Sequence, residues 1–268
     1  MKMKHMKIAI LIAFIAIAIS CSLFLVFSFN PSFSEKDAFM VVFGNYDSIH
    51  KSAAWKNMNF PKSAEVENDF WKSKTGTVSK VFFEPYKENG KKKFFFLTKT
   101  SPINTNYDCH ACLPLLSATI FSKKKWKWEI ESQNLFLMYE GEYAESPIVN
   151  LIRVGDEKYG ATLECEHRSG ESFDKEWYLL IPHDKNIVIA HQETRYYDDF
   201  NSCDHVIQCA AYSTTFNFSK VPNDTFYQLT VKKFGTSNDE PPYYKAVPVD
   251  EEVTYQILNG EYVKISSK

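Results

Sequence analysis

Two close pairs of cysteines are the residues of this chain best placed to do chemistry. Each pair encloses a histidine, and the six residues are Cys109, His110, Cys112, Cys203, His205 and Cys209. In an oxidising compartment, cysteines this close in sequence most simply form disulfides that staple loops. We therefore expect one local bridge within each pair, each contributing on the order of 2–3 kcal/mol in the chain-entropy model.

The same residues permit two other interpretations. A C-x-x-C motif with a histidine inside it is typical of thiol oxidoreductases, because the histidine can lower the pKa of a thiol. Here Pro114 and a strand-like stretch follow the motif, whereas a thioredoxin-type site opens a helix. Zinc could instead be held by the four cysteines, with His110 or His205 as alternates. The five residues between Cys203 and Cys209 depart from the usual spacing of zinc ligands. We prefer structural bridges and keep both alternatives open.

Other signs of catalysis are weaker. The sequence has no nucleophile-elbow, zinc-protease or phosphate-loop motif, and its histidines are dispersed. One cluster of side chains could supply oxygen ligands to calcium, namely Asp198, Asp199, Asn201 and Asp204. It lacks the glycine and the final glutamate of a calcium-binding loop, so we favour a solvated turn. Aromatic side chains could line a carbohydrate or peptide groove, although in a β domain most belong to the core. We predict no catalytic residue and no cofactor, and we favour a protein that is not an enzyme.

The first thirty residues predict export and a membrane tether. Lys2, Lys4 and Lys7 precede an apolar run over 8–29, which as a helix would reach roughly 33 Å and cross a hydrocarbon core of about 30 Å. The lysines place the N-terminal side in the cytoplasm. We favour an uncleaved signal anchor over a signal peptide cut near Ser28 or a lipoprotein signal with lipid on Cys21. Each interpretation puts the remaining chain outside the cytoplasm, in the periplasm or at the cell surface.

Composition beyond residue 30 indicates a folded, mildly acidic domain. Hydrophobic residues make up 44% of the whole chain and aromatic residues 16%, which supplies ample material for a core. Because residues 1–30 hold three lysines and no acid, 28 basic and 33 acidic side chains remain, for a net charge of −5. This balance argues against nucleic acid as a partner. We expect the lysine runs at 91–93 and 123–125 to cap solvated turns and protect strand edges.

The spacing of apolar residues predicts a mainly β fold. Over 31–77, helix-like intervals indicate a mixed prelude with one or two short helices. Over 78–268, alternation of apolar and polar residues predicts about eleven strands joined by short turns. In the stretch over 125–131, this alternation would bury Trp126, Trp128 and Ile130 on one face. We expect an antiparallel meander that closes into a sandwich or barrel-like domain.

Several short motifs in this β region occur together in an uncharacterised group of bacterial exported proteins. They are a D-C-H-x-C motif at 108–112, the alternating stretch over 125–131, a K-Y-G strand start at 158–160 and a closing G-x-Y-V hairpin at 260–263. Over roughly 80–265 the chain resembles this group. The resemblance implies a β-rich fold and an envelope location, and it implies no activity. We therefore expect a tethered extracytoplasmic domain, stapled by disulfides, that binds an envelope protein or ligand.

Overall fold

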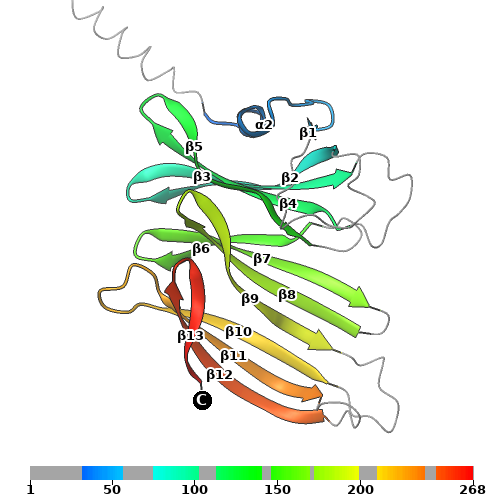
Figure 1. Cartoon of the computed structure of the whole chain (residues 1–268), viewed down its shortest axis with the longest axis vertical. Helices are drawn as coiled ribbons and strands as arrows, with labels where there is room; N and C mark the ends of the chain where they lie inside the picture. The colour runs from blue at the N-terminus through cyan, green and yellow to red at the C-terminus, as the bar shows by residue number, and fades with distance from the viewer. Residues whose placement is uncertain are drawn as a thin grey trace, which may run out of the picture.

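Nearly every described segment of the chain is a β-strand, and every described pair of neighbouring strands is antiparallel (Figure 1). The computed structural model describes residues 32–56, 75–102, 113–140, 146–169, 172–198, 210–238 and 246–267. These residues form two sheets and one short helix. The prediction of a mainly β, antiparallel fold is confirmed.

The first sheet has five strands in chain order and one helix packed on it. The strands are β1 (Ser52–Trp55), β2 (Gly76–Glu88), β3 (Lys91–Pro102), β4 (Leu115–Lys124) and β5 (Lys127–Tyr139). Helix α2 (Glu35–Phe43) begins at Ser34, whose hydroxyl accepts a hydrogen bond from the Asp37 backbone amide while the Asp37 carboxylate caps the Ser34 backbone amide. It ends at Gly44, which has the left-handed φ of 74° that favours glycine. One short helix in the prelude was therefore predicted correctly.

The second sheet has eight strands and curls into a half-barrel. In order they are β6 (Ile148–Gly155), β7 (Lys158–Ser169), β8 (Ser172–His183), β9 (Asn186–Asp198), β10 (Ala211–Ser219), β11 (Gln228–Asn238), β12 (Ala246–Leu258) and β13 (Glu261–Ser267). The curl brings the edge strand β6 against the segment before β11, where the Tyr227 amide donates to the Val154 carbonyl at 2.7 Å. Residue 155 must be glycine there, because a Cβ would lie 2.2 Å from the Thr225 carbonyl oxygen.

Three apolar clusters hold these layers together. The first lies between the two sheets and joins residues such as Leu97 and Leu116 to Leu163 and Leu180 of the second sheet. The second packs α2 and Phe33 against the outer face of the first sheet. The third lies inside the curl of the second sheet and runs from β6 to β13. Burial of these side chains at roughly 25 cal/mol per Å² is the main force that holds the sheets in register.

The predicted burial of Trp126 is wrong. Trp126 does not lie on a buried face, since it occupies the two-residue turn between β4 and β5 and is 78% exposed. The turn residue before it, Lys125, has a φ of 53°, so the chain reverses at the point where the sequence pattern continues the strand. Ile130 is 38% exposed, and only Trp128 packs into the outer cluster.

The predicted membrane segment over 8–29 lies outside the described residues. Within the described ranges, there is no helix with the length and hydropathy to span a bilayer.

Candidate functional site

The residues predicted to form disulfides, to bind zinc or to carry lipid all lie outside the described part of the chain. They are Cys21, Cys109, His110, Cys112, Cys203, His205 and Cys209. The disulfide, zinc and lipidation assignments therefore stay predictions. Within the described residues, no group of three or more histidine, cysteine or acidic side chains is arranged to hold a metal.

Cys165 is the described cysteine, and it is free and buried. Burial raises the pKa of its thiol, and the nearby carboxylates of Glu140 and Glu176 raise it further. A thiol held in its protonated form is a poor nucleophile. Around it, Glu140 accepts a hydrogen bond from the Tyr178 hydroxyl at 2.7 Å and lies 2.5 Å from His167 Nε2. This polar cluster therefore joins the two sheets structurally.

A pocket of about 660 Å³ opens on the second sheet, and its lining combines polar side chains with aromatic rings, as ligand sites do. It is lined by side chains of four strands, β7 to β10, namely Glu164, Phe173, Lys175, Arg195, Tyr196, Asp198, Ser213, Thr214 and Thr215. Glu164 alternates along β7 with Leu163 and Cys165, which face the first sheet. The pocket therefore lies on the opposite face, the one that forms the inside of the curl.

The backbone creates this pocket by separating two strands. The ladder between β9 and β10 covers only three residue pairs, from Ala211 with Asp198 to Ser213 with Tyr196. Just beyond, β9 carries a bulge, because Thr194 and Tyr196 pair with consecutive residues of β8 and Arg195 is left over. A bulge re-aims the side chains of a strand and often occurs next to a functional site.

The Thr214 side chain spans the opened ladder. The Thr214 hydroxyl donates to the Thr194 carbonyl at 2.7 Å, so it satisfies a backbone oxygen that the separated strand would otherwise leave bare. The side chain of Arg195, turned by the bulge, reaches across β8 to form an ion pair with Glu164.

The charges that line the pocket balance one another. Arg195 pairs with Glu164, and Lys175 pairs with Glu166 at 2.5 Å between Nζ and Oε1. The Tyr196 hydroxyl donates to Asp198 at 2.9 Å, and this hydrogen bond raises the pKa of Tyr196. Two acidic and two basic residues lie among the lining side chains, so the pocket as a whole carries no net charge.

Two aromatic rings give the pocket its apolar surface. The ring centroids of Phe173 and Tyr196 lie 5.9 Å apart at an interplanar angle of 56°. Lys175 Nζ lies 5.5 Å from the Phe173 centroid, an attractive cation–π distance. Aromatic rings held in this way have few conformations to lose when a ligand binds, so they can serve as rigid contact surfaces.

A second group of polar side chains lies inside the curl, among apolar residues. His191 is only 9% exposed and packs against the rings of Trp177 and Tyr255, with centroids at 6.2 and 4.6 Å. Burial lowers the pKa of His191 to about 4, so its ring is neutral at physiological pH. Glu193 lies 3.9 Å from His191 Nε2, and burial raises its pKa. Neither residue lines the pocket.

Comparison with known proteins does not assign the chain to a family. No protein-family model matches the chain, and no curated protein or solved structure matches it either.

Sequence reasoning missed the pocket residues except for Asp198, which it considered only as a calcium ligand. In the structure Asp198 lies beside Tyr196 and Phe173 at the end of β9. The alternation of Phe173 and Lys175 with residues facing the other sheet was a signal that could have placed them on one face. The bulge at Arg195 has no such sequence signal, and it decides where the pocket forms.

Proposed function

We propose that this chain is a membrane-tethered, extracytoplasmic binding protein without catalytic activity, and that its pocket takes an uncharged, hydroxyl-rich ligand such as an envelope saccharide. The observation that carries the proposal is a lining without net charge, in which Arg195 pairs with Glu164 and the Tyr196 hydroxyl donates to Asp198. An anionic ligand that drew Arg195 away would leave the Glu164 carboxylate, which is only 16% exposed, without its counter-charge. A ligand rich in hydroxyl groups can instead accept from Arg195 and donate to Glu164 while the pair stays intact.

The remaining lining groups support the same chemistry. Ser213, Thr214 and Thr215 come from one strand and add small polar groups, while Phe173 and Tyr196 offer apolar faces. A site with a few convergent polar groups and aromatic surface fits a ligand that is polar at its edge and apolar on its face. Saccharides have this character, and they are available in a cell envelope.

The location follows from the N-terminal sequence. The run over 8–29 would tether the domain to the membrane, and the positive residues before it would leave the domain in the periplasm or at the cell surface. The two cysteine pairs would then act as staples. Cys203 and Cys209 lie in the segment that joins Asp198 to Ala210, so a bridge between them would shorten the connection next to the pocket.

Saturation-transfer NMR of the protein with a panel of neutral oligosaccharides tests the ligand assignment. We expect at least one member of the panel to bind, and Phe173→Ala to weaken that binding by about tenfold, the size of one aromatic contact. Phe234→Ala is the matched control, because Phe234 is 64% exposed and does not line the pocket. Equal loss in both variants, or binding by no member of the panel, would refute the saccharide assignment.

The competing function is zinc binding or thiol redox chemistry by the cysteine pairs. Non-reducing mass spectrometry of the exported protein distinguishes the two. We expect a Cys109–Cys112 bridge and a Cys203–Cys209 bridge, since close thiols oxidise readily outside the cytoplasm. Four free thiols with one bound zinc would establish the metal site instead, and insulin reduction lost on Cys109→Ser would establish redox catalysis.

A further inference from the structure

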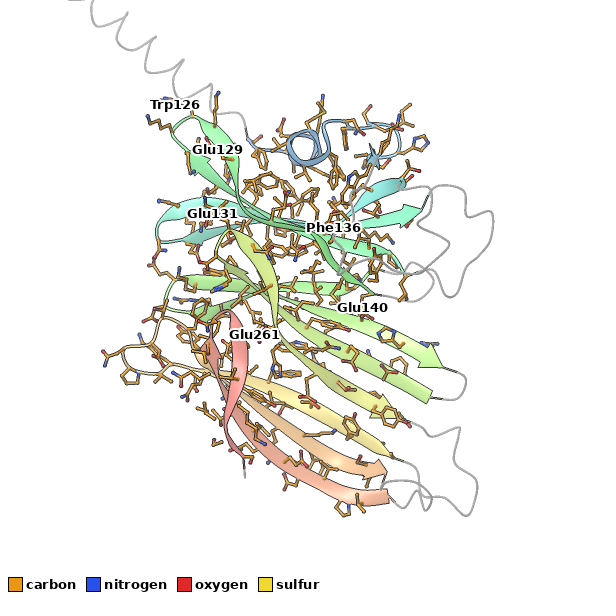
Figure 2. All side chains as sticks on the ribbon, viewed as in Figure 1. Trp126, Glu129, Glu131, Phe136, Glu140 and Glu261 are labelled. Carbon is orange, nitrogen blue, oxygen red and sulfur yellow. The ribbon has the colours of Figure 1, made fainter. Side chains whose placement is uncertain are left out.

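The turn between β4 and β5 presents an exposed tryptophan among lysines. Trp126 is 78% exposed at the end of this hairpin, and Figure 2 shows it at the tip, away from the body of the two sheets. Lys123, Lys124, Lys125 and Lys127 surround it, and Glu129 is the one acidic residue over 123–129. Lys124 pairs with Glu129 at 3.1 Å. The tip therefore combines an amphipathic aromatic ring with a net charge of +3, although the domain as a whole is acidic.

This hairpin lies where the chain enters the described structure. Phe33 is 8% exposed and contacts the rings of Trp128, Phe121 and Phe94, with the Trp128 centroid at 4.9 Å in a stacked arrangement. The base of the hairpin thus fixes the chain only four residues after the apolar run ends at Phe29. Four residues span at most about 14 Å. If the run crosses a bilayer, the hairpin cannot lie far from the membrane surface.

Other apolar side chains are exposed at the same end of the molecule. Met40 and Val41 of α2 are each 46% exposed, and Ile49, in the connection from α2 to β1, is 83% exposed. Figure 1 shows α2 and the tip of the β4–β5 hairpin together at this end, opposite β11 and β12. Isolated apolar residues on a surface need no explanation, but here they accompany a basic aromatic tip at the end nearest the tether.

We propose that the β4–β5 hairpin docks on an anionic lipid bilayer, with the Trp126 ring at the level of the headgroups and with Lys125 and Lys127 on lipid phosphates. The inference rests on the proposed tether. Tryptophan is enriched at membrane interfaces because its ring is apolar and its N–H can reach water. Each lysine near an anionic surface adds attraction within about a Debye length, roughly 8 Å at physiological salt. Docking would hold the second sheet and its pocket in a fixed orientation above the membrane.

Fluorescence quenching in reconstituted full-length protein tests this docking. The chain is placed in vesicles of phosphatidylcholine, with or without phosphatidylglycerol, that carry lipids brominated near the headgroup. We expect these lipids to quench tryptophan fluorescence in the anionic vesicles, and we expect Trp126→Phe to lose most of the quenching. Trp177→Phe is the matched control, because Trp177 is 3% exposed inside the second sheet.

A variant with fewer lysines tests whether the hairpin binds the bilayer or only lies near it because of the tether. Replacing Lys125 and Lys127 with glutamine should shift the equilibrium between docked and free hairpin by about thirtyfold in anionic vesicles and little in neutral ones. The same double change at Lys232 and Lys264, which lie on β11 and β13, should have no effect. Unquenched Trp126 in a chain that stays in the membrane after an alkaline wash would overturn the docking alone. Release of the chain by that wash would overturn the tether itself.

Discussion

Replacing Lys93 with methionine is expected to lower the free energy of unfolding by about 3–5 kcal/mol, the usual cost of removing one partner of a buried ion pair. Lys93 is 6% exposed on β3 and pairs with Glu88, which is 3% exposed, and with Glu131 at 2.5 Å. Burial opposes the charged ammonium, but hydrogen bonds to Glu131 and Glu88 outweigh it and raise the pKa of Lys93. Without the lysine, the Glu88 carboxylate is left buried with no counter-charge.

Urea unfolding measures the effect, with two further variants as controls. Lys92→Met changes the neighbouring exposed lysine and should cost less than about 1 kcal/mol, as exposed charges do. Adding Glu88→Gln to Lys93→Met should restore part of the lost stability, because it removes the unpaired charge. A Lys93→Met protein as stable as Lys92→Met would show that the ion pair does not stabilise the first sheet.

The wild-type protein is expected to lose about 3 kcal/mol of stability through His191 as the pH falls from about 6.5 to about 4. The ordinary pKa of histidine applies in the unfolded chain, whereas burial lowers the pKa of His191 to about 4 in the folded one. Between these values the unfolded chain binds a proton that the folded chain does not. The contribution of His191 to the free energy of unfolding is therefore fully present above pH 6.5, and it is lost as the solution is acidified.

His191→Gln removes this titration and isolates its contribution. Burial raises the pKa of Glu193, so as the pH falls the folded protein binds a proton there before the unfolded chain does. Protonation of Glu193 therefore stabilises the folded state and partly offsets the loss through His191. Because Glu193 is present in both proteins, its own titration largely cancels in the difference between wild type and His191→Gln, which reports His191 together with its coupling to Glu193 at 3.9 Å. Thermal unfolding across this pH range should show the wild type losing more stability than the variant. Parallel pH profiles would mean that His191 already binds a proton in the folded state.

Much of the architecture could be predicted from residue alternation. Strands such as β10 and β12 alternate apolar and polar residues over their length because one face lines the curl. β2 escaped prediction because its pattern is broken by the adjacent Phe82 and Phe83, by a bulge after Lys80 and by Pro85. The boundary between the two sheets, which falls between β5 and β6, also has no local signal. On both sides of this boundary, strands that follow one another in the chain are neighbours in a sheet.

Residue type alone misled the sequence argument at one of the two lysine runs. We expected 91–93 to cap a solvated turn, and Lys91 and Lys92 are exposed, but Lys93 is buried between two glutamates. Its position opposite Tyr86 and Ser122 in the ladder decides this, and pairing across strands is a long-range property. The run at 123–125 leads into an exposed turn, as expected. The unexpected residue is Trp126, which follows this run and is exposed, although the strand pattern would have buried it.

The pocket could not be predicted because it depends on a break in strand pairing. Glu164 and Arg195 are 31 positions apart, and they meet only because the β9 bulge turns Arg195 toward β7. Bulges arise from the balance of twist and ladder hydrogen bonds over a whole sheet, which short-range patterns do not encode. The predicted cysteine chemistry lies beyond the described residues and still awaits its chemical test.

The most direct test of the account is the location and sidedness of the full-length protein in its native cells. Membranes are washed with alkaline carbonate, and intact cells with a permeabilised outer layer are treated with protease from outside. We expect the protein to stay in the washed membranes and its β domain to be digested from outside. Recovery of intact protein from the cytosol, with its cysteines reduced, would contradict it.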